Sequence, residues 1–327
     1  MKRELNLKDA IFIYGISLVG MLIFSVVSTM VPEGNLQIYL SYLFPQIAYI
    51  VATVVYVKAR KIAFFGNEIF SYRVNPLGIL LTLPILVGVF CQDLIIAQAF
   101  SWLVELTGVT PSITMPTMNN AKEIIIAIIL LCVLPAIGEE MLYRGVFLHS
   151  MKRYGATFAV VVSGIIFALT HFNVAQIVHQ CILGMILSYV TLVSGRLIYA
   201  IVIHFVNNLV AIILPIVIPS YNNLATLNTT SVLIMLAMMV AGIIILYPSL
   251  FGFVKIAGRR EFSRRECNFF TLFSKNARAL WYNNMNECEE ELALPAKVAL
   301  KQPIFIGFMV FLVVMSVASF ALEMMVI

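Results

Sequence analysis

Long, almost uninterrupted apolar stretches alternate with short polar segments along the chain. A helix of about 20 apolar residues matches the thickness of the hydrocarbon core of a bilayer. Nine stretches approach this length, namely residues 9–31, 37–57, 77–102, 123–148, 156–172, 174–193, 197–218, 231–254 and 303–325. The third contains Asp93 and the fifth is short, so these two are the weakest candidates. The pattern predicts an all-α, polytopic integral membrane protein with about nine transmembrane helices.

Composition agrees with this interpretation. Of the 327 residues, 61% are hydrophobic and 11% are charged, whereas soluble domains carry about 25% charged residues. A mean hydropathy of +0.99 excludes a soluble globule of this length. The five cysteines show neither a disulfide framework nor the paired C-x-x-C spacing of a zinc site. The basic N-terminus leads into an apolar run that we expect to be retained as the first span.

The positions of the basic residues predict an orientation. Cytoplasmic loops of membrane proteins are enriched in Lys and Arg. With a cytoplasmic N-terminus and nine spans, all 21 Lys and Arg residues except Lys122 and Arg144 fall in cytoplasmic segments. An error of one span would destroy this alternation. We therefore expect a multi-pass protein of the cell membrane with its N-terminus in the cytoplasm and its C-terminus outside.

The chain divides into three parts by hydropathy and by the placement of polar groups. Residues 1–119 hold transmembrane helices one to three, residues 120–218 hold a core of four helices, and residues 219–327 hold helices eight and nine. The last part includes a long basic loop, 255–302, which we interpret as a solvated cytoplasmic loop that steers topology. Contact of this loop with anionic lipid is the alternative. Nothing in the chain indicates nucleic-acid binding.

Three ionisable residues lie inside the fourth predicted span, where charge is costly. Glu140 and Arg144 are four residues apart, with the acid first, which is the favourable order for a helical ion pair. Glu139 is rotated by about 100° around the helix and has Tyr143 as its one polar neighbour on the same helix. A carboxylate without an adjacent cation accepts a proton more readily on burial. Glu139 is therefore the candidate general base and Glu140 the candidate structural ion pair.

Polar residues on two other predicted spans can reach the same layer of the membrane. Phe167 and His171 are four residues apart at the end of the fifth span, and His204 and Asn208 share a face of the seventh. A carboxylate and a neutral histidine can deprotonate a water molecule. A second histidine and an asparagine can donate hydrogen bonds to an oxyanion. Together these residues predict a hydrolase of amide bonds that uses water as the nucleophile and needs no metal or other cofactor.

Other interpretations of these residues remain open. Glu139, Glu140, His171 and His204 could bind zinc, although the H-E-x-x-H pattern of metalloproteases is absent. Buried carboxylates could instead carry protons in a transporter, which would predict inverted repeats that the sequence lacks. The role of Asp93 is also undecided.

Three ordered sequence patterns resemble a known family. G-E-E-x-x-x-R, F-x-x-x-H and H-x-x-x-N occur in this order on successive hydrophobic helices, across roughly residues 120–215. This arrangement resembles the CAAX-processing and bacteriocin-processing (CPBP or Abi) proteases, whose eukaryotic branch includes the Ras-converting endopeptidase. The resemblance implies an intramembrane glutamic peptidase without a required metal.

The resemblance also implies roles for single residues. Glu139 and His171 would activate water, and His204 and Asn208 would form the oxyanion site. From the residues themselves we expect four further side chains to support the site: Glu140 and Arg144 as the ion pair, and Phe167 and Tyr143 by packing around it. The substrate would be a membrane-embedded or lipidated peptide or protein. The alternative within the same fold is a non-catalytic scaffold, a regulator or a bacteriocin-immunity protein.

Overall fold

The computed structural model of the chain describes residues 4–62, 64, 74–109, 115–217, 228–258 and 294–325. Regular secondary structure in these ranges is helical. The long helices are α1 (Leu7–Ser28), α2 (Asn35–Ala59), α3 (Pro76–Glu105), α8 (Ile177–Ser194), α9 (Leu197–Val217), α10 (Thr229–Ala257) and α15 (Pro303–Met325). Shorter helices are α7 (Ala156–Leu169), the 3₁₀ turn η5 (Val174–Gln176) and α14 (Ala296–Leu300).

The fourth predicted span forms one helical rod, Ala121–Tyr154. Its α-helical parts are α4 (Ala121–Ile128), α5 (Leu134–Glu140) and α6 (His149–Met151). They alternate with the wider π turns η2 (Ile129–Val133) and η3 (Met141–Leu148), and the rod ends in the 3₁₀ turn η4 (Lys152–Tyr154). We call this element the rod helix.

In the described part of the chain, eight helices are long and apolar enough to cross a membrane. The fifth predicted span corresponds to α7, which has 14 residues and is about 21 Å long at 1.5 Å per residue. Large apolar side chains point outward along the long helices, among them Val19, Leu80, Ile244 and Val317. Soluble proteins rarely expose so much apolar surface. The prediction of an all-α, polytopic membrane protein is confirmed.

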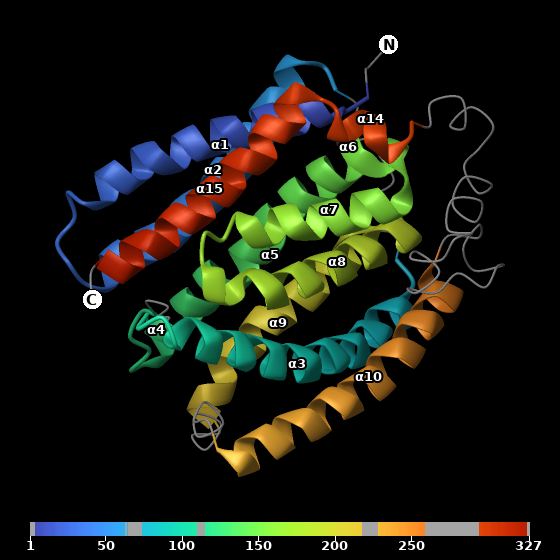
Figure 1. Cartoon of the computed structure of the whole chain (residues 1–327). Coiled ribbons are helices and arrows are strands. Elements are labelled where there is room, and N and C mark those ends of the chain that lie inside the picture. Colours follow the sequence, from blue (N-terminus) through green and yellow to red (C-terminus); the bar gives the residue numbers. More distant parts are fainter. Residues whose placement is uncertain are drawn as a thin grey trace.

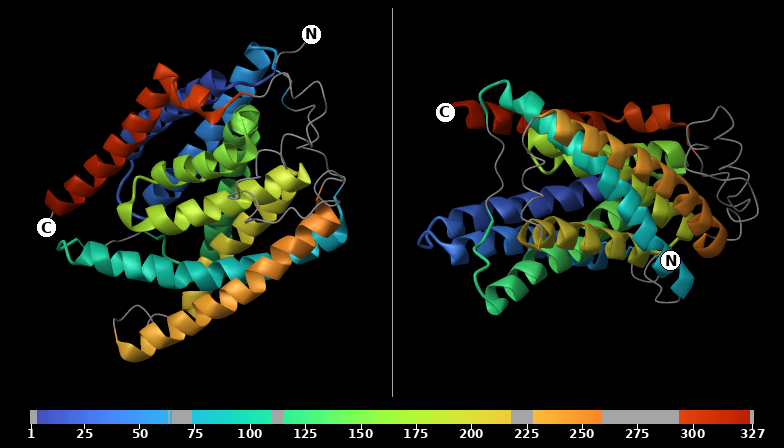
Figure 2. Two further views of the ribbon diagram at one scale, coloured as in Figure 1. Left: turned by 45° about the vertical axis from the view of Figure 1, so that its right-hand side comes forward. Right: turned by 90° about the horizontal axis from the view of Figure 1, so that it is seen from below.

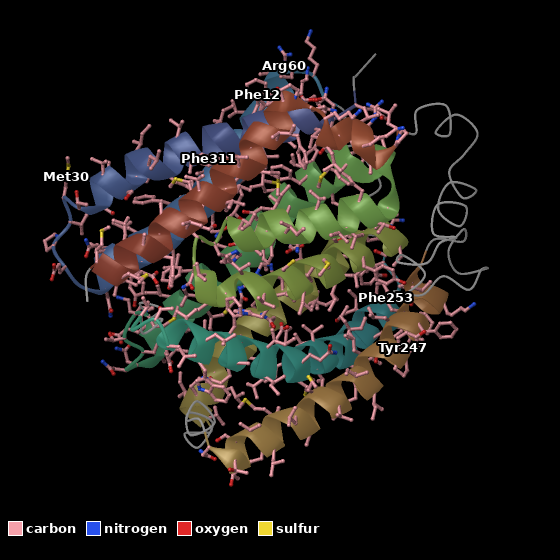
Figure 3. All side chains as sticks on the ribbon, viewed as in Figure 1. Phe12, Met30, Arg60, Tyr247, Phe253 and Phe311 are labelled. Carbon is pink, nitrogen blue, oxygen red and sulfur yellow. The ribbon has the colours of Figure 1, made fainter. Side chains whose placement is uncertain are left out.

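Successive helices run in opposite directions, so that their ends gather at two ends of the bundle (Figures 1 and 2). The start of α1, the ends of α2 and α10, the rod–α7 and α8–α9 junctions and α14 share one end. Figure 3 labels Arg60 at this end and Met30 at the opposite end. The described residues at this end include Lys8, Lys58, Arg60, Lys61, Lys152, Arg153, Arg196, Lys255, Lys297 and Lys301. We call it the basic end.

The rod helix, α7, α8 and α9 lie in the middle of the bundle (Figure 1). On one flank α3 packs against α8 and α9, and α10 packs along the outside of α3. On the other flank α2 packs against the rod helix, and α1 lies against both α2 and α15. One large apolar cluster joins these layers, with contributions from Tyr14, Phe147, Phe167, Phe253 and Leu312. The polar residues singled out in the sequence therefore lie on the innermost helices.

Glycines allow α7 and α8 to pack closely. A Cβ atom placed on Gly184 would lie 2.9 Å from the Cα atom of Gly164, a distance that real Cβ atoms essentially never show. Small residues of this kind let membrane helices bring their backbones together. The close packing brings the backbone of α8 within reach of polar groups on the rod helix.

The short length of α7 places its end inside the bundle. Figure 1 shows the turn between α7 and α8 set back from the far ends of α1 and α15. Phe172 in this turn adopts a left-handed conformation with φ of 50°, which is uncommon for a non-glycine residue. His171 immediately precedes it. This histidine, which the sequence places at the end of a span, thus lies within the thickness of the bundle.

Candidate active site

Pro135 shapes the rod helix just before the two glutamates. Proline lacks the N–H group that would bond to the carbonyl four residues earlier, which here belongs to Leu131. The side-chain amide of Asn208 donates a hydrogen bond to this carbonyl at 3.0 Å. π turns lie on both sides of the Glu139–Glu140 pair, and such turns frequently occur at functional sites. Asn208 therefore ties α9 to the rod helix where the regular helical bonding is interrupted.

Glu140 and Arg144 form a fully buried ion pair. Arg144 Nη1 lies 2.7 Å from Glu140 Oε1, and both side chains are 0% exposed. Arg144 Nη2 donates to the carbonyl of Gly184 at 3.1 Å. The guanidinium carbon also lies 4.5 Å from the centre of the Phe167 ring, within range of a cation–π interaction. The contact predicted from the i, i+4 spacing is present, and it links the rod helix to α7 and α8.

His204 bridges the two glutamates from α9. Its Nδ1 atom lies 2.8 Å from Glu140 Oε1, the same oxygen that Arg144 contacts. Because a carboxylate paired with Arg144 can only accept, Nδ1 of His204 is the donor. The other ring nitrogen, Nε2, lies 3.9 Å from Oε2 of Glu139. The imidazole is thus oriented by one glutamate and faces the other.

Glu139 is the more accessible acid of the pair, with 14% of its side chain exposed. Its Oε1 atom accepts a hydrogen bond of 2.9 Å from Nε2 of Gln46, a residue of α2. Helical spacing gives Glu139 no polar neighbour except Tyr143. The sequence therefore did not predict Gln46 as a partner of Glu139. One signal could have indicated it, because Gln46 is a polar residue within an apolar span, where an unpaired amide is costly.

His171 is fixed by the end of α7. Its Nδ1 atom lies 2.7 Å from the carbonyl oxygen of Phe167. A carbonyl can only accept, so Nδ1 carries the proton and Nε2 of the neutral ring has a free lone pair. The Phe167 ring meets His171 edge-on at 4.8 Å and His204 edge-on at 5.9 Å between ring centres. Phe167 therefore packs against both imidazoles.

Tyr143 supports the same turn from the rod helix. Its hydroxyl donates to Oγ1 of Thr170 at 2.7 Å and lies 3.3 Å from the hydroxyl of Tyr49 on α2. The Thr170 hydroxyl in turn donates to the Phe167 carbonyl at 2.8 Å. This chain of hydroxyl groups links α2, the rod helix and the turn that holds His171.

The candidate residues thus converge from three predicted spans. Phe167 packs against both His171 and His204, and no direct hydrogen bond joins His171 to Glu139 in the described part of the chain. Residues 121–210, which contain all of these groups except the α2 partners, match the family model described as type II CAAX prenyl endopeptidase Rce1-like.

This segment is therefore similar to the Rce1-like family. The match covers the rod helix, α7, α8 and most of α9, and leaves α1 to α3, α10 and α15 outside it. Comparison with curated proteins and with solved structures gave no match. The resemblance inferred from the three sequence patterns is therefore supported by an independent comparison over the same part of the chain.

Asp93 lies outside the cluster of Rce1-like residues. It is 9% exposed within α3, and its Oδ1 atom has no hydrogen-bond partner among the described residues. Arg144 contacts Glu140 and Gly184 and not Asp93. Across the described residues, no group of three or more His, Cys, Asp or Glu side chains is arranged to hold a metal ion.

The buried ion pair of the Rce1-like segment predicts a large effect on stability. In Arg144→Met, the buried carboxylate of Glu140 would lose its guanidinium partner and keep only the contact with His204, and we expect a loss of about 3–5 kcal/mol in the free energy of unfolding. The double variant Glu140→Gln, Arg144→Met removes both charges and should recover much of this loss. Denaturation of the purified protein in detergent measures both.

Lys152→Met is the control, because it replaces another basic residue of the rod helix, in its last turn, by the same methionine. A loss of stability in Lys152→Met equal to that in Arg144→Met would contradict the assignment, as would a double variant that is less stable than Arg144→Met.

Proposed function

We propose that this chain is an intramembrane endopeptidase that hydrolyses a peptide bond of a membrane-associated or lipidated peptide or protein. The supporting observation is the position of Glu139 in the Rce1-like segment. One carboxylate oxygen accepts a hydrogen bond from Gln46, and the other faces the ring of His204 at 3.9 Å. Such an acid, partly exposed within a bundle of membrane helices, suits the activation of a water molecule.

In the proposed reaction, Glu139 and His171 hold and deprotonate the attacking water. The tautomer of His171 supports this role, because its Nδ1–H group bonds to the Phe167 carbonyl and leaves the Nε2 lone pair free. The oxygen of the water attacks the carbonyl carbon of the scissile bond while its proton passes to the Glu139 carboxylate. The product of this step is a tetrahedral intermediate with a negative oxygen.

His204 and Asn208 would stabilise that oxygen. With Nδ1 donating to Glu140, the His204 ring can donate from Nε2 only as the charged imidazolium. Asn208 uses one amide N–H on the Leu131 carbonyl and retains a second for the oxyanion.

The intermediate then collapses. Its carbon–nitrogen bond breaks, the carbonyl re-forms as a carboxyl group, and the proton held by Glu139 passes to the leaving amine. No step requires a metal ion or another cofactor. The arrangement of basic residues further supports a cell-membrane protein whose basic end faces the cytoplasm, which puts the N-terminus inside and the C-terminus outside.

The proposal predicts that activity depends on the carboxylate of Glu139. In Glu139→Gln the shape is kept but proton transfer is lost, so we expect cleavage to fall by about 10²–10⁴-fold. Membrane peptides from cells that carry either form are compared by mass spectrometry, so the substrate does not have to be identified in advance.

Glu123→Gln, near the start of the rod helix, is the matched control and should behave as the unmodified protein. A non-catalytic scaffold would give the same peptides whether Glu139 is kept or replaced, provided that expression is equal. Identical peptide profiles would therefore refute the peptidase.

The proposed chemistry also predicts resistance to chelators. Purified protein treated with EDTA or 1,10-phenanthroline should keep its rate on a peptide identified by the mass-spectrometric comparison, because the proton acceptors are side chains of the protein itself. Loss of activity on chelation, with recovery on addition of Zn²⁺, would instead favour the zinc enzyme.

A further inference from the structure

Gln46 contacts the proposed base from outside the Rce1-like segment. Its side chain is 5% exposed and follows Pro45 within α2. Nε2 donates to Glu139 Oε1 at 2.9 Å, whereas its Oε1 has no hydrogen-bond partner among the described residues. Among the described residues, the Gln46 amide therefore bonds to Glu139, the carboxylate that the proposed reaction uses.

Gly138 provides the space that this amide occupies. A Cβ atom on Gly138 would lie 2.6 Å from Gln46 Oε1 and 3.4 Å from the backbone oxygen of Gln46. Gly138 lies within α5, where any L-residue could adopt the backbone conformation. The glycine that precedes the two glutamates is thus required for close approach of α2 and not for backbone freedom.

We propose that Gln46, seated against Gly138, is a positioning residue for Glu139. This inference rests on the proposed function. The bond to Oε1 restricts rotation of the carboxylate, so that Oε2 is directed to His204 and to the attacking water. A displacement of about 1 Å at a reacting group can lower the rate by about 10²-fold. The site is therefore completed by α2, which the family match does not include.

Gln46→Met tests this role, because methionine has a similar length but no donor. On a synthetic peptide whose cleavage depends on Glu139, we expect kcat to fall by about 10–100-fold with KM changed by less than about twofold. Gln46→Asn, which keeps the amide but is too short to reach, should behave in the same way. Gln92→Met is the matched control, since the amide of Gln92 bonds to the carbonyl of Gly88 in its own helix.

Gly138→Ala provides a second test. The added methyl group would displace the Gln46 amide, so Gly138→Ala alone should be less active than the unmodified protein. The double variant Gly138→Ala, Gln46→Met should be as active as Gln46→Met alone, because the contact is already lost. Additive losses would overturn the proposed contact, and so would a kcat for Gln46→Met and Gln46→Asn equal to that of Gln92→Met. If no peptide depends on Glu139 at all, the proposed function itself fails.

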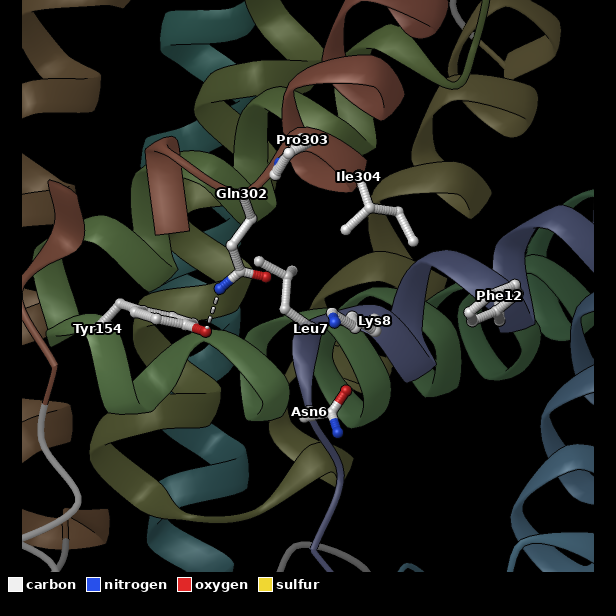
Figure 4. A pocket seen from close by; sticks show the side chains of 8 residues that line it. All are labelled: Asn6, Leu7, Lys8, Phe12, Tyr154, Gln302, Pro303 and Ile304. Atoms are coloured by element: carbon white, nitrogen blue, oxygen red, sulfur yellow. Dashed lines mark hydrogen bonds between the residues drawn. The ribbon is translucent and has the colours of Figure 1, made fainter. Parts of the chain in front are cut away.

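A cavity at the basic end carries a second, independent inference. Its volume is about 730 Å³, and it lies between the starts of α1 and α15, beside the end of the rod helix (Figure 4). Leu7 and Phe12 of α1 and Pro303 and Ile304 of α15 form its apolar lining. Phe12 is 54% exposed, so the apolar part of the cavity opens on the side that faces lipid.

The polar lining offers hydrogen-bond donors. Gln302 Nε2 donates to the Tyr154 hydroxyl at 2.8 Å (Figure 4), and Tyr154 retains its own proton for a ligand. Asn6 uses Oδ1 as an acceptor for the backbone of Asp9 and leaves its amide NH₂ available. Lys8 is exposed and forms no ion pair in the described part of the chain. Among the described residues, no acidic side chain lines the cavity.

We propose that this cavity binds an anionic phospholipid. Lys8, Asn6 and Tyr154 would contact the phosphate, and the acyl chains would lie along Phe12 and Ile304. This division matches the boundary of a bilayer, where headgroups and hydrocarbon meet, and basic residues near that surface attract anionic lipid. The rod helix, which holds both glutamates, would contact the lipid through Tyr154.

Native mass spectrometry of the full-length protein with phosphatidylglycerol or phosphatidylcholine tests this site. We expect phosphatidylglycerol to be retained preferentially, and Lys8→Gln and Tyr154→Phe to lower the retained fraction at least about threefold. Lys58→Gln, an exposed lysine at the same end but outside the cavity, is the control. Phosphatidylglycerol should also raise the melting temperature, whereas inorganic phosphate should not.

Equal retention of both lipids would indicate a nonselective lipid shell and overturn the site. The same conclusion follows if Lys8→Gln and Tyr154→Phe bind phosphatidylglycerol as the unmodified protein does. Stabilisation by inorganic phosphate alone would show an anion site without a lipid and would also overturn the proposal.

Discussion

The buried contact between Glu140 and Arg144 sets the arrangement of the site. Neither charge has access to water, and removal of Glu140 would leave the Arg144 guanidinium without its carboxylate partner in a medium of low dielectric constant. The pair therefore fixes the face of the rod helix that points inward. Because His204 donates to the same carboxylate oxygen and Arg144 reaches the Gly184 carbonyl, the pair also fixes α9 and α8 relative to the rod helix. Glu139, one residue away, is directed to the remaining open side.

A second constraint is that polar backbone groups inside a membrane need partners from the protein itself. Pro135 removes one such partner from the rod helix, and Asn208 replaces it at Leu131. The end of α7 exposes the Phe167 carbonyl within the bundle, and Thr170 and His171 bond to it. In both places a break in helical bonding is satisfied by a residue of the candidate site. The interruptions of the helices and the polar cluster are therefore parts of one arrangement.

Hydropathy sufficed to predict the helices, because each span must be apolar over a length set by the bilayer. The i, i+4 rule sufficed for Glu140 and Arg144, because both lie on one helix of known geometry. Contacts between helices were not predictable in the same way. The sequence places His204 and Asn208 on one face of a span, but it does not reveal that one bonds to Glu140 and the other to a backbone carbonyl. Gln46 was missed because its partner lies 93 residues away and depends on how α2 packs against Gly138.

These contacts show which part of the chain carries the polar groups of the candidate site and which part restrains them. Residues 121–210 contain the acids, both histidines and the asparagine. The groups that restrain them come partly from α2, where Gln46 bonds to Glu139 and Tyr49 lies against Tyr143. A helix hydrogen-bonded to the site at two points, 2.9 Å and 3.3 Å, cannot move away without disturbing both the proposed base and the turn that holds His171. The four central helices thus supply the chemical groups, and α2 supplies part of the geometry in which those groups can act together.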